Sequence, residues 1–206
     1  MTKKMKLDKI NSALVIVAHP DDETIWCGGF IMKHPQIKWT IFSLCRANDP
    51  VRAAKFKKVC QFLKTRAIIT NLEDEGKLSI KKSVPVIKRL ILKNIKGKYF
   101  AYLFTHGANG EYGHPRHIGV HQAVKQLVKE KKLKAKNVFY FNYFKPKQDK
   151  TKLPVAKKDS DYLIKLSQEE LKKKRAIVSK IYGFNLNSFE VLACTNPEAF
   201  KIEGIK

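Results

Sequence analysis

The chain has 206 residues, of which 44% are hydrophobic and 10% aromatic, so it can bury one substantial core and we expect a single domain over residues 1–206. No apolar run approaches the roughly 20 residues that a membrane-spanning helix needs, and no secretory signal is visible, which predicts a soluble, cytoplasmic protein. The formal net charge is +24, from 42 basic against 18 acidic residues.

Apolar, β-branched runs alternate along the chain with longer amphipathic stretches, which is typical of a parallel sheet covered by helices. The predicted strands are Ala13–Ala18, Trp39–Leu44, Ala67–Thr70, Tyr99–Thr105, Asn137–Phe141 and Phe189–Ala193. The predicted helices are Asp22–Lys33, Val51–Lys64, Ile80–Ile95, Pro115–Lys131 and Ser167–Ile181. The segment Lys145–Asp161, rich in Lys, Asp and Pro, predicts a long surface loop. The expected fold class is α/β: a Rossmann-like, three-layer single domain with a mostly parallel sheet.

The first polar cluster ends the first predicted strand, in V-I-V-A-H-P-D-D-E at residues 15–23. In open α/β sheets, ligands bind outside the carboxyl ends of the strands, so this cluster lies where a site is expected. His19 and Asp22 are three residues apart, which lets an imidazole nitrogen and a carboxylate oxygen reach one metal ion, and Asp21 lies between them. The alternative is that the acids at 21–23 only cap a helix N-terminus.

The second cluster, T-H-G-A-N-G-E-Y-G-H-P-R-H at residues 105–117, ends the predicted strand Tyr99–Thr105. His114 and His117 are three apart at a predicted helix start, so both can point to the same side. Solvated or capping histidines are the alternative. Two histidine-bearing loops at the carboxyl ends of two strands nevertheless favour a metal site, and three His and Asp ligands with an open position are typical of catalytic zinc.

The charge leaves several partners open, because dense positive charge attracts phosphates of nucleic acids, membranes or substrates. Only six basic residues are arginine, the side chain that suits bidentate phosphate recognition, and the rest are lysine. Lysine spread along the chain also fits a solvated surface in a lysine-biased proteome. We expect no specific nucleic acid, and keep an anionic substrate and peripheral contact with an anionic membrane as alternatives. The four cysteines form no C-x-x-C pair and are expected to be reduced structural thiols.

The motifs A-H-P-D-D-E and G-H-P-x-H, in this order, resemble those of the zinc de-N-acetylases of the LmbE-like and PIG-L-like superfamily, and the resemblance runs from Ala13 to about Leu127. It implies a Zn²⁺ cofactor held by His19, Asp22 and His117. Asp21 then matches the general base that takes a proton from the attacking water. His114 matches the residue that stabilises the oxyanion or protonates the departing amine, roles that fit a positively charged imidazole.

The same resemblance implies roles for five further residues. It implies that Tyr112 helps to polarise the carbonyl and that Glu23 and His106 support the metal ligands, with Glu23 as a partner of His19. Arg52 and Asp74 lie where members of the family often contact the substrate.

One position departs from the family pattern. Many members have an acidic residue between Pro115 and His117, where this chain has Arg116. An arginine there is expected to lower the pKa of His114 and weaken it as a proton donor. Alternatively, Arg116 binds a substrate phosphate.

The activity implied is hydrolysis of the N-acetyl group of an N-acetylglucosamine-type conjugate, such as a sugar-phosphate, a glycolipid or a nucleotide-sugar. His and Asp ligands accept both zinc and iron. Two other hypotheses are a degenerate member that binds sugar or metal without turnover, and a basic nucleic-acid-binding protein, which no aromatic-interleaved basic motif supports.

Overall fold

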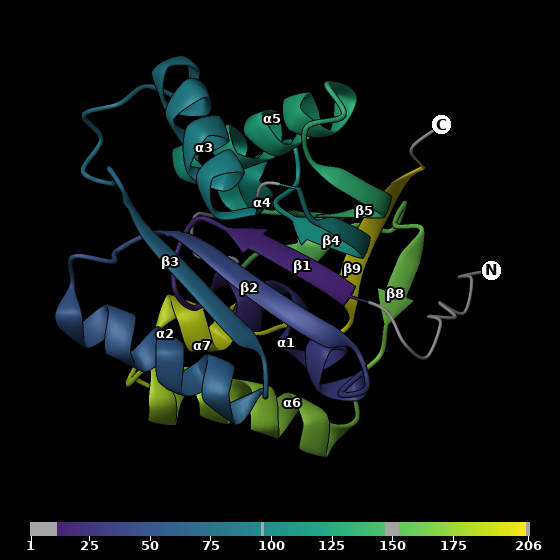
Figure 1. Cartoon of the computed structure of the whole chain (residues 1–206). Helices are drawn as coiled ribbons and strands as arrows, with labels where there is room; N and C mark the ends of the chain where they lie inside the picture. The colour runs from purple at the N-terminus through teal and green to yellow at the C-terminus, as the bar shows by residue number, and fades with distance from the viewer. Residues whose placement is uncertain (1–11, 96, 147–152, 205–206) are drawn as a thin grey trace.

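The computed structural model describes residues 12–95, 97–146 and 153–204. Its centre is a seven-stranded sheet in the order β3-β2-β1-β4-β5-β9-β8 (Figure 1). Strands β3, β2, β1, β4 and β5 are parallel, and β9 and β8 add an antiparallel edge. The strands of this sheet are β1 Ser12–Val17, β2 Lys38–Cys45, β3 Arg66–Leu72, β4 Tyr99–Thr105, β5 Lys134–Phe141, β8 Tyr162–Ile164 and β9 Glu198–Gly204. A small second sheet pairs β6 (Tyr143–Phe144) with β7 (Val155–Ala156).

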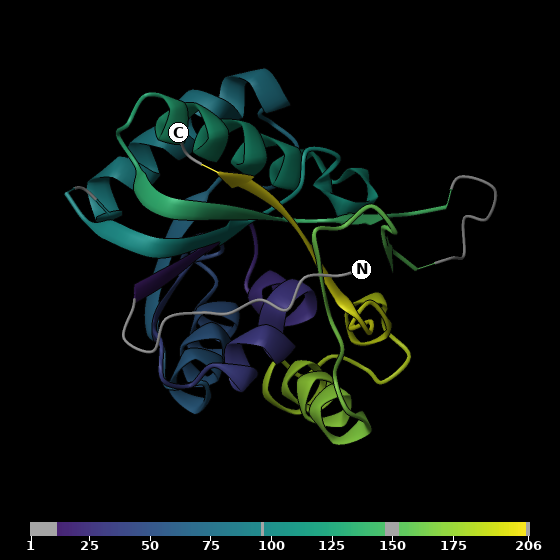
Figure 2. The ribbon, with the colours of Figure 1, turned by 90° about the vertical axis from the view of Figure 1, so that its right-hand side faces the viewer.

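Helices cover both faces of the sheet, which makes three layers (Figures 1 and 2). One face carries α3 (Ile80–Ile95) and α5 (Pro115–Lys129). The other carries α1 (Asp22–Lys33), α2 (Pro50–Phe62), α6 (Gln168–Ala176), the π-helix η1 (Ile177–Ile181) and α7 (Phe189–Leu192). The short helix α4 (Gly110–Gly113) lies between β4 and α5. The predicted three-layer α/β fold is confirmed.

Strand β1 explains why a continuous apolar run suits the centre of such a sheet. Leu14 and Ile16 enter the core under α3 and α5, whereas Ala13, Val15 and Val17 enter the core on the opposite face. All five side chains are fully buried. A central parallel strand is covered on both faces, so neither face of it needs polar residues.

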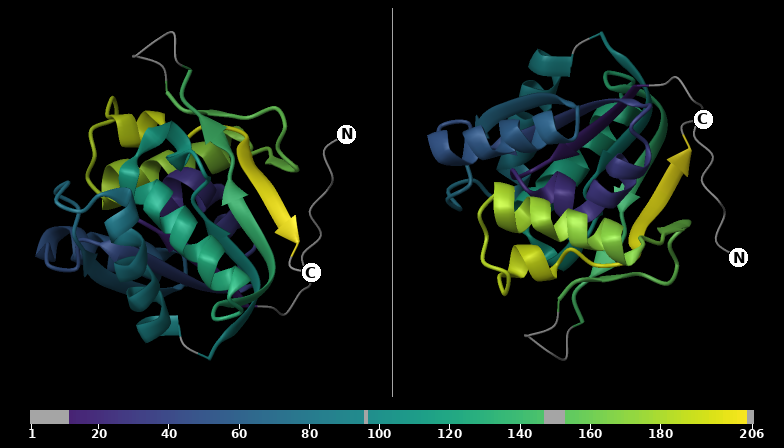
Figure 3. Two further views of the ribbon diagram at one scale, coloured as in Figure 1. Left: turned by 90° about the horizontal axis from the view of Figure 1, so that it is seen from above. Right: turned by 90° about the horizontal axis from the view of Figure 1, so that it is seen from below.

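Two parts of the prediction were wrong near the C-terminus. The predicted strand Phe189–Ala193 is the helix α7, because the Ser188 hydroxyl accepts a hydrogen bond from the Val191 N–H and caps a helical turn. The last strand is instead β9, which Figure 3 shows in yellow at the side of the sheet. The predicted loop Lys145–Asp161 contains β7, and its residues 147–152 lie outside the described part of the chain.

Other boundaries agree within a few residues, and the predicted helix Ser167–Ile181 corresponds to α6 followed by η1. All four cysteines are buried and free. Within the described residues, no helix is both long and apolar enough to span a bilayer.

A buried ion pair ties the C-terminal elements to α1, whose first residue is Asp22. Helix α1 is kinked at Cys27 (φ −146°, ψ 15°), and the N–H groups of Gly29 and Phe30 donate to the two oxygens of Glu198, at 2.8 and 2.7 Å. Lys174 Nζ of α6 lies 2.6 Å from Glu198, and both side chains are fully buried. Glu198 therefore caps the second half of α1 and carries the counter-charge for Lys174.

We expect Lys174→Met to lower the free energy of unfolding by about 3 kcal/mol, because it leaves the Glu198 carboxylate buried without its cation. Urea unfolding followed by circular dichroism measures this, with Lys173→Met on the exposed side of the same helix as control, expected to change stability by less than about 0.5 kcal/mol. Equal stability of Lys174→Met and the parent would show that the pair contributes nothing.

Candidate active site

The site lies at the carboxyl ends of β1 and β4, which are parallel neighbours with Ile16 opposite Thr105. The Thr105 hydroxyl donates to the Ile16 carbonyl (2.9 Å), and the Ala18 N–H donates to His106 Nε2 (3.0 Å). The two loops that carry the sequence motifs are therefore joined directly by hydrogen bonds.

Three predicted metal ligands meet at this junction. The distance from His19 Nδ1 to Asp22 Oδ2 is 3.3 Å, that from His117 Nε2 to Asp22 Oδ2 is 3.3 Å, and that between the two nitrogens is 3.4 Å. Two donors about 2.0–2.1 Å from a tetrahedral ion are roughly 3.3–3.4 Å apart, so the triangle fits such an ion. Two overlapping groups at this junction could hold a metal ion: His19 with His114 and His117, and the fully buried set of Asp22, His106 and His117.

Each ligand histidine is oriented by a carboxylate. His19 Nε2 lies 2.9 Å from Asp74 Oδ1, and His117 Nδ1 lies 2.6 Å from Glu111 Oε2. When these nitrogens donate to the carboxylates, the opposite nitrogen of each ring keeps its lone pair for the metal. Burial lowers the pKa of His117, but Asp22 and Glu111 outweigh it and raise the pKa to about 9.

Glu111 was missed as a site residue. Its side chain is fully buried, and its backbone adopts a positive φ of 59°. Besides His117, its carboxylate accepts hydrogen bonds from the His106 ring (2.8 Å) and the Gly107 N–H (2.8 Å). Burial raises the pKa of Glu111, but the two histidines outweigh it and hold the pKa at about 2. One sequence feature could have identified Glu111 as a site residue. It is an acidic residue within a glycine- and histidine-rich loop that follows a strand, where an acid with no structural partner is hard to explain.

Asp74 and Glu23 have partners that the sequence did not suggest. Asp74, expected to contact substrate, is the partner of His19 and also accepts from Arg46 (2.7 Å). Glu23, expected beside His19, instead accepts from the Asp21 N–H (3.0 Å) and the Tyr182 hydroxyl (2.8 Å). It supports the strained backbone of Asp21, which has a φ of 121°.

Asp21 and Arg52 form an ion pair at the edge of the site, with Arg52 Nη2 2.8 Å from Asp21 Oδ2. Burial and the neighbouring Asp22 raise the pKa of Asp21, against the opposing effect of Arg52. The guanidinium also lies over the Phe184 ring, 4.7 Å from its centroid. Arg52 thus holds a predicted catalytic carboxylate and also lines the cavity, and its predicted contact with the substrate stays a prediction.

His114 begins helix α5, and its Nδ1 accepts a hydrogen bond from the Arg116 N–H (3.2 Å). Its ring centroid lies 4.8 Å from that of His19 and 4.6 Å from that of His117. Burial and these two charged neighbours lower the pKa of His114 to about 4. The direction agrees with the prediction, but the cause is not the Arg116 guanidinium.

The Arg116 side chain is only 3% exposed and contacts the loop at residues 73–78. It donates to the Leu78 carbonyl (2.8 Å) and to Glu73. These bonds anchor the loop at residues 73–78, which carries Asp74. Two of the guanidinium nitrogens are thus engaged with this loop, and the hypothesis that Arg116 binds a substrate phosphate stays a prediction.

A cavity of about 200 Å³ opens over two of the candidate ligands, His19 and Asp22. Tyr112 lines it, together with four residues that the sequence did not suggest, which are Ile25 and Trp26 of α1 and Phe189 and Glu190 of α7. The Tyr112 and Phe189 rings pack edge to face at 5.0 Å. The lining residues are His19, Asp21, Asp22, Ile25, Trp26, Arg52, Asp74, Tyr112, His114, Phe189 and Glu190.

A family model described as GlcNAc-PI de-N-acetylase (PIG-L) matches residues 14–128. That range is more than half of the chain and includes both motif loops. The chain belongs to the PIG-L family. The comparison with curated proteins found no match.

Several solved structures share the fold of this PIG-L family chain. N,N'-diacetylchitobiose deacetylase from Pyrococcus horikoshii has a TM-score of 0.67 at 14% identity, over 94% of this chain and 84% of that one. A deacetylase of teicoplanin biosynthesis has a TM-score of 0.59 at 14% identity, over 86% and 88%. GalB, a 4-carboxy-2-hydroxymuconate hydratase from Pseudomonas putida, has a TM-score of 0.60 at 14% identity, over 89% and 82%. One fold thus serves deacetylases and a hydratase.

We expect Glu111→Gln to weaken the binding of a divalent metal by about 10- to 100-fold, because the neutral amide orients His117 less firmly. Titration with Co²⁺, followed by its visible absorption, measures this affinity. Glu130→Gln, at the far end of α5, is the control and should bind Co²⁺ as the parent does. Unchanged affinity in Glu111→Gln would contradict the orienting role.

Proposed function

We propose that the chain is a zinc-dependent hydrolase that removes the N-acetyl group from an amino sugar of the N-acetylglucosamine type. The observation that carries this proposal is the triangle of His19 Nδ1, Asp22 Oδ2 and His117 Nε2, with sides of 3.3–3.4 Å, at the motif positions of a de-N-acetylase family. These three residues would hold the zinc ion. The conjugated group is a phosphate, a lipid or a nucleotide.

The chemistry that zinc supplies when bound is Lewis acidity, which polarises the amide carbonyl and acidifies water. Asp21 lies beside the ligands and takes a proton from the water that attacks the carbonyl carbon. Its raised pKa suits this role, since a general base works best with a pKa near the working pH. Arg52 engages Oδ2, and Oδ1 has no partner among the described residues, so it is the atom that accepts the proton.

His114 and Tyr112 act on the carbonyl oxygen as neutral donors. Because His114 Nδ1 accepts from the Arg116 N–H, the ring hydrogen is on Nε2 and can be donated to the developing oxyanion. This role replaces the positively charged imidazole that the sequence suggested. Burial and the charges of Asp22 and Asp21 raise the pKa of Tyr112, so its phenol stays protonated.

In the last step, Asp21 donates the proton that it took from water to the amide nitrogen. The bond between the acyl carbon and nitrogen then breaks, which releases acetate and the free amine of the sugar. Water supplies the oxygen atom and both hydrogens, so no other co-reactant is needed. The deacetylases among the structures that share the fold support this reaction class.

Acetate release from a panel of N-acetylglucosaminyl compounds tests the proposal. We expect Asp21→Asn to lower the rate by at least about 100-fold, because the amide cannot accept the proton. The variant should retain zinc, measured by elemental analysis, since Asp21 is not one of the three ligands. Restoring the chelated parent with Zn²⁺ or Fe²⁺ identifies the active metal.

Three outcomes would contradict parts of this proposal. Full activity of Asp21→Asn would remove the base assignment. A zinc-loaded parent that releases no acetate from any member of the panel would point to a sugar- or metal-binding protein without turnover. Salt-sensitive duplex binding by a metal-free protein would instead favour the nucleic-acid hypothesis.

A further inference from the structure

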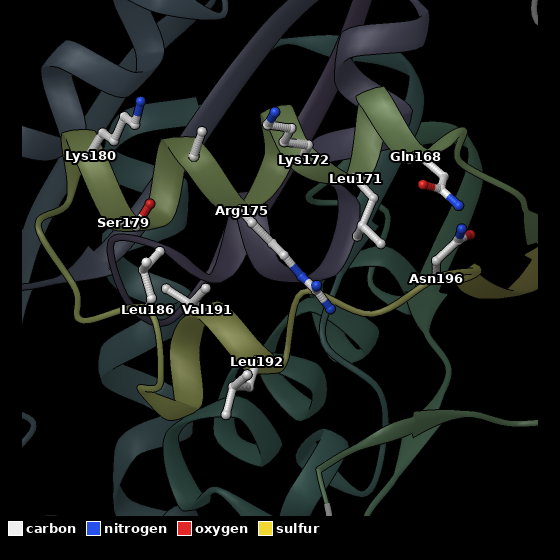
Figure 4. Close-up of a pocket in the computed structure, with 11 residues that line it drawn as sticks. Gln168, Leu171, Lys172, Arg175, Ser179, Lys180, Leu186, Val191, Leu192 and Asn196 are labelled. Carbon is white, nitrogen blue, oxygen red and sulfur yellow. The ribbon is translucent and has the colours of Figure 1, made fainter.

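Helix α7 separates two hollows on the surface. Phe189 and Glu190 line the catalytic cavity, whereas Val191 and Leu192 line a groove of about 690 Å³ between α7 and the continuous helix formed by α6 and η1. Figure 4 shows this groove, with Arg175 reaching into it from α6. Adjacent residues of one short helix therefore face two different environments.

The two hollows have opposite charge. The groove is lined by Lys172, Arg175 and Lys180, and none of its eleven lining residues is acidic. The catalytic cavity is lined by four carboxylates, with Arg52 as the one lysine or arginine among its lining residues. The four are Asp21, Asp22, Asp74 and Glu190. The large positive charge of the chain is thus not concentrated around the reacting atoms.

Three of these carboxylates already have partners. Asp21 pairs with Arg52, Asp22 contacts both ligand histidines, and Asp74 lies between His19 and Arg46. The Glu190 carboxylate forms no hydrogen bond or ion pair with any residue in the described ranges. Glu190 is therefore the lining acid with both carboxylate oxygens available to a molecule in the cavity.

Aromatic rings lie beside Glu190. Phe189 packs on Tyr112 at 5.0 Å, and Tyr112 lies 6.3 Å from Trp26, with all three rings on the cavity wall. A sugar presents C–H faces that pack on aromatic rings and hydroxyl groups that donate to a carboxylate. A ring phosphate or carboxylate would instead meet Glu190 with like charge, which is unfavourable.

We propose that Glu190 is a specificity-determining residue, which accepts hydrogen bonds from the hydroxyl groups of an uncharged sugar ring and disfavours an anionic group on that ring. The inference rests on the proposed function and restricts its substrates to those whose reacting sugar ring is uncharged. Any phosphate or other anion of the conjugate belongs beyond the reacting sugar, outside the four-carboxylate cavity.

The test compares the parent, Glu190→Gln and a matched control, Glu169→Gln. Ser167 and Ser188 cap α6 and α7, so Glu169 and Glu190 both occupy the second helical position, but Glu169 does not line the cavity. The substrates are the methyl glycoside of N-acetylglucosamine and N-acetylglucosamine 6-phosphate. Acetate release gives kcat and KM for each.

We expect the parent to prefer the neutral glycoside. Glu190→Gln should lower kcat/KM for it by about 10- to 100-fold, mainly through KM, because a charge-assisted hydrogen bond is lost. The preference over the 6-phosphate should shrink in the same variant. Glu169→Gln should match the parent on both substrates, and all three proteins should contain equal zinc.

The proposal is overturned if Glu190→Gln matches the parent on both substrates, or if the parent prefers the 6-phosphate. If the parent releases no acetate at all, the proposed function fails, and calorimetry with the same glycoside tests Glu190 separately. Weaker binding to Glu190→Gln than to the parent then supports the recognition role. Equal binding, or no binding to the parent, overturns it.

Discussion

The parallel pairing of β1 with β4 is the constraint on which the site depends. With Ile16 opposite Thr105, both strands end at the same edge of the sheet, and the loops that follow them lie side by side. Positions 88 residues apart then share a hydrogen bond, from the Ala18 N–H to the His106 ring. Side chains from the two loops are therefore close together. The nitrogens of two imidazoles and one carboxylate oxygen lie within 3.4 Å of one another.

The charges buried at this edge are mutually dependent. An isolated buried charge is costly, so each needs an opposite charge or strong donors close by. Glu111 lies between two imidazoles, Asp74 lies between His19 and Arg46, and Arg116 anchors the loop that carries Asp74. The same contacts that offset the cost of burial also decide which nitrogen of His19 and of His117 faces the candidate metal position.

Most of the fold could be predicted because its strands and helices are encoded over short distances, whereas the proposed ligand set was implied by the family resemblance of the two motifs. His19 and Asp22 are three residues apart, and the strands are apolar runs. The partners of the histidines could not be predicted in this way, because Asp74 is 55 residues from His19 and spacing does not say which acid reaches which ring. Helix α7 was mistaken for a strand because a short apolar run fits either element.

The C-terminal segment completes a site whose motifs lie elsewhere. The PIG-L match ends at residue 128, yet Tyr182 supports Glu23, Phe184 covers Arg52, and α7 walls the cavity. None of these residues belongs to a catalytic motif, so sequence patterns gave no signal for them. A similar fold occurs in deacetylases and in a hydratase at 14% identity, so the sheet alone does not determine the reaction. The proposed catalytic groups lie at the strand ends, whereas part of the cavity wall comes from a later segment, so substitutions in that wall can alter substrate choice without altering the proposed catalytic groups.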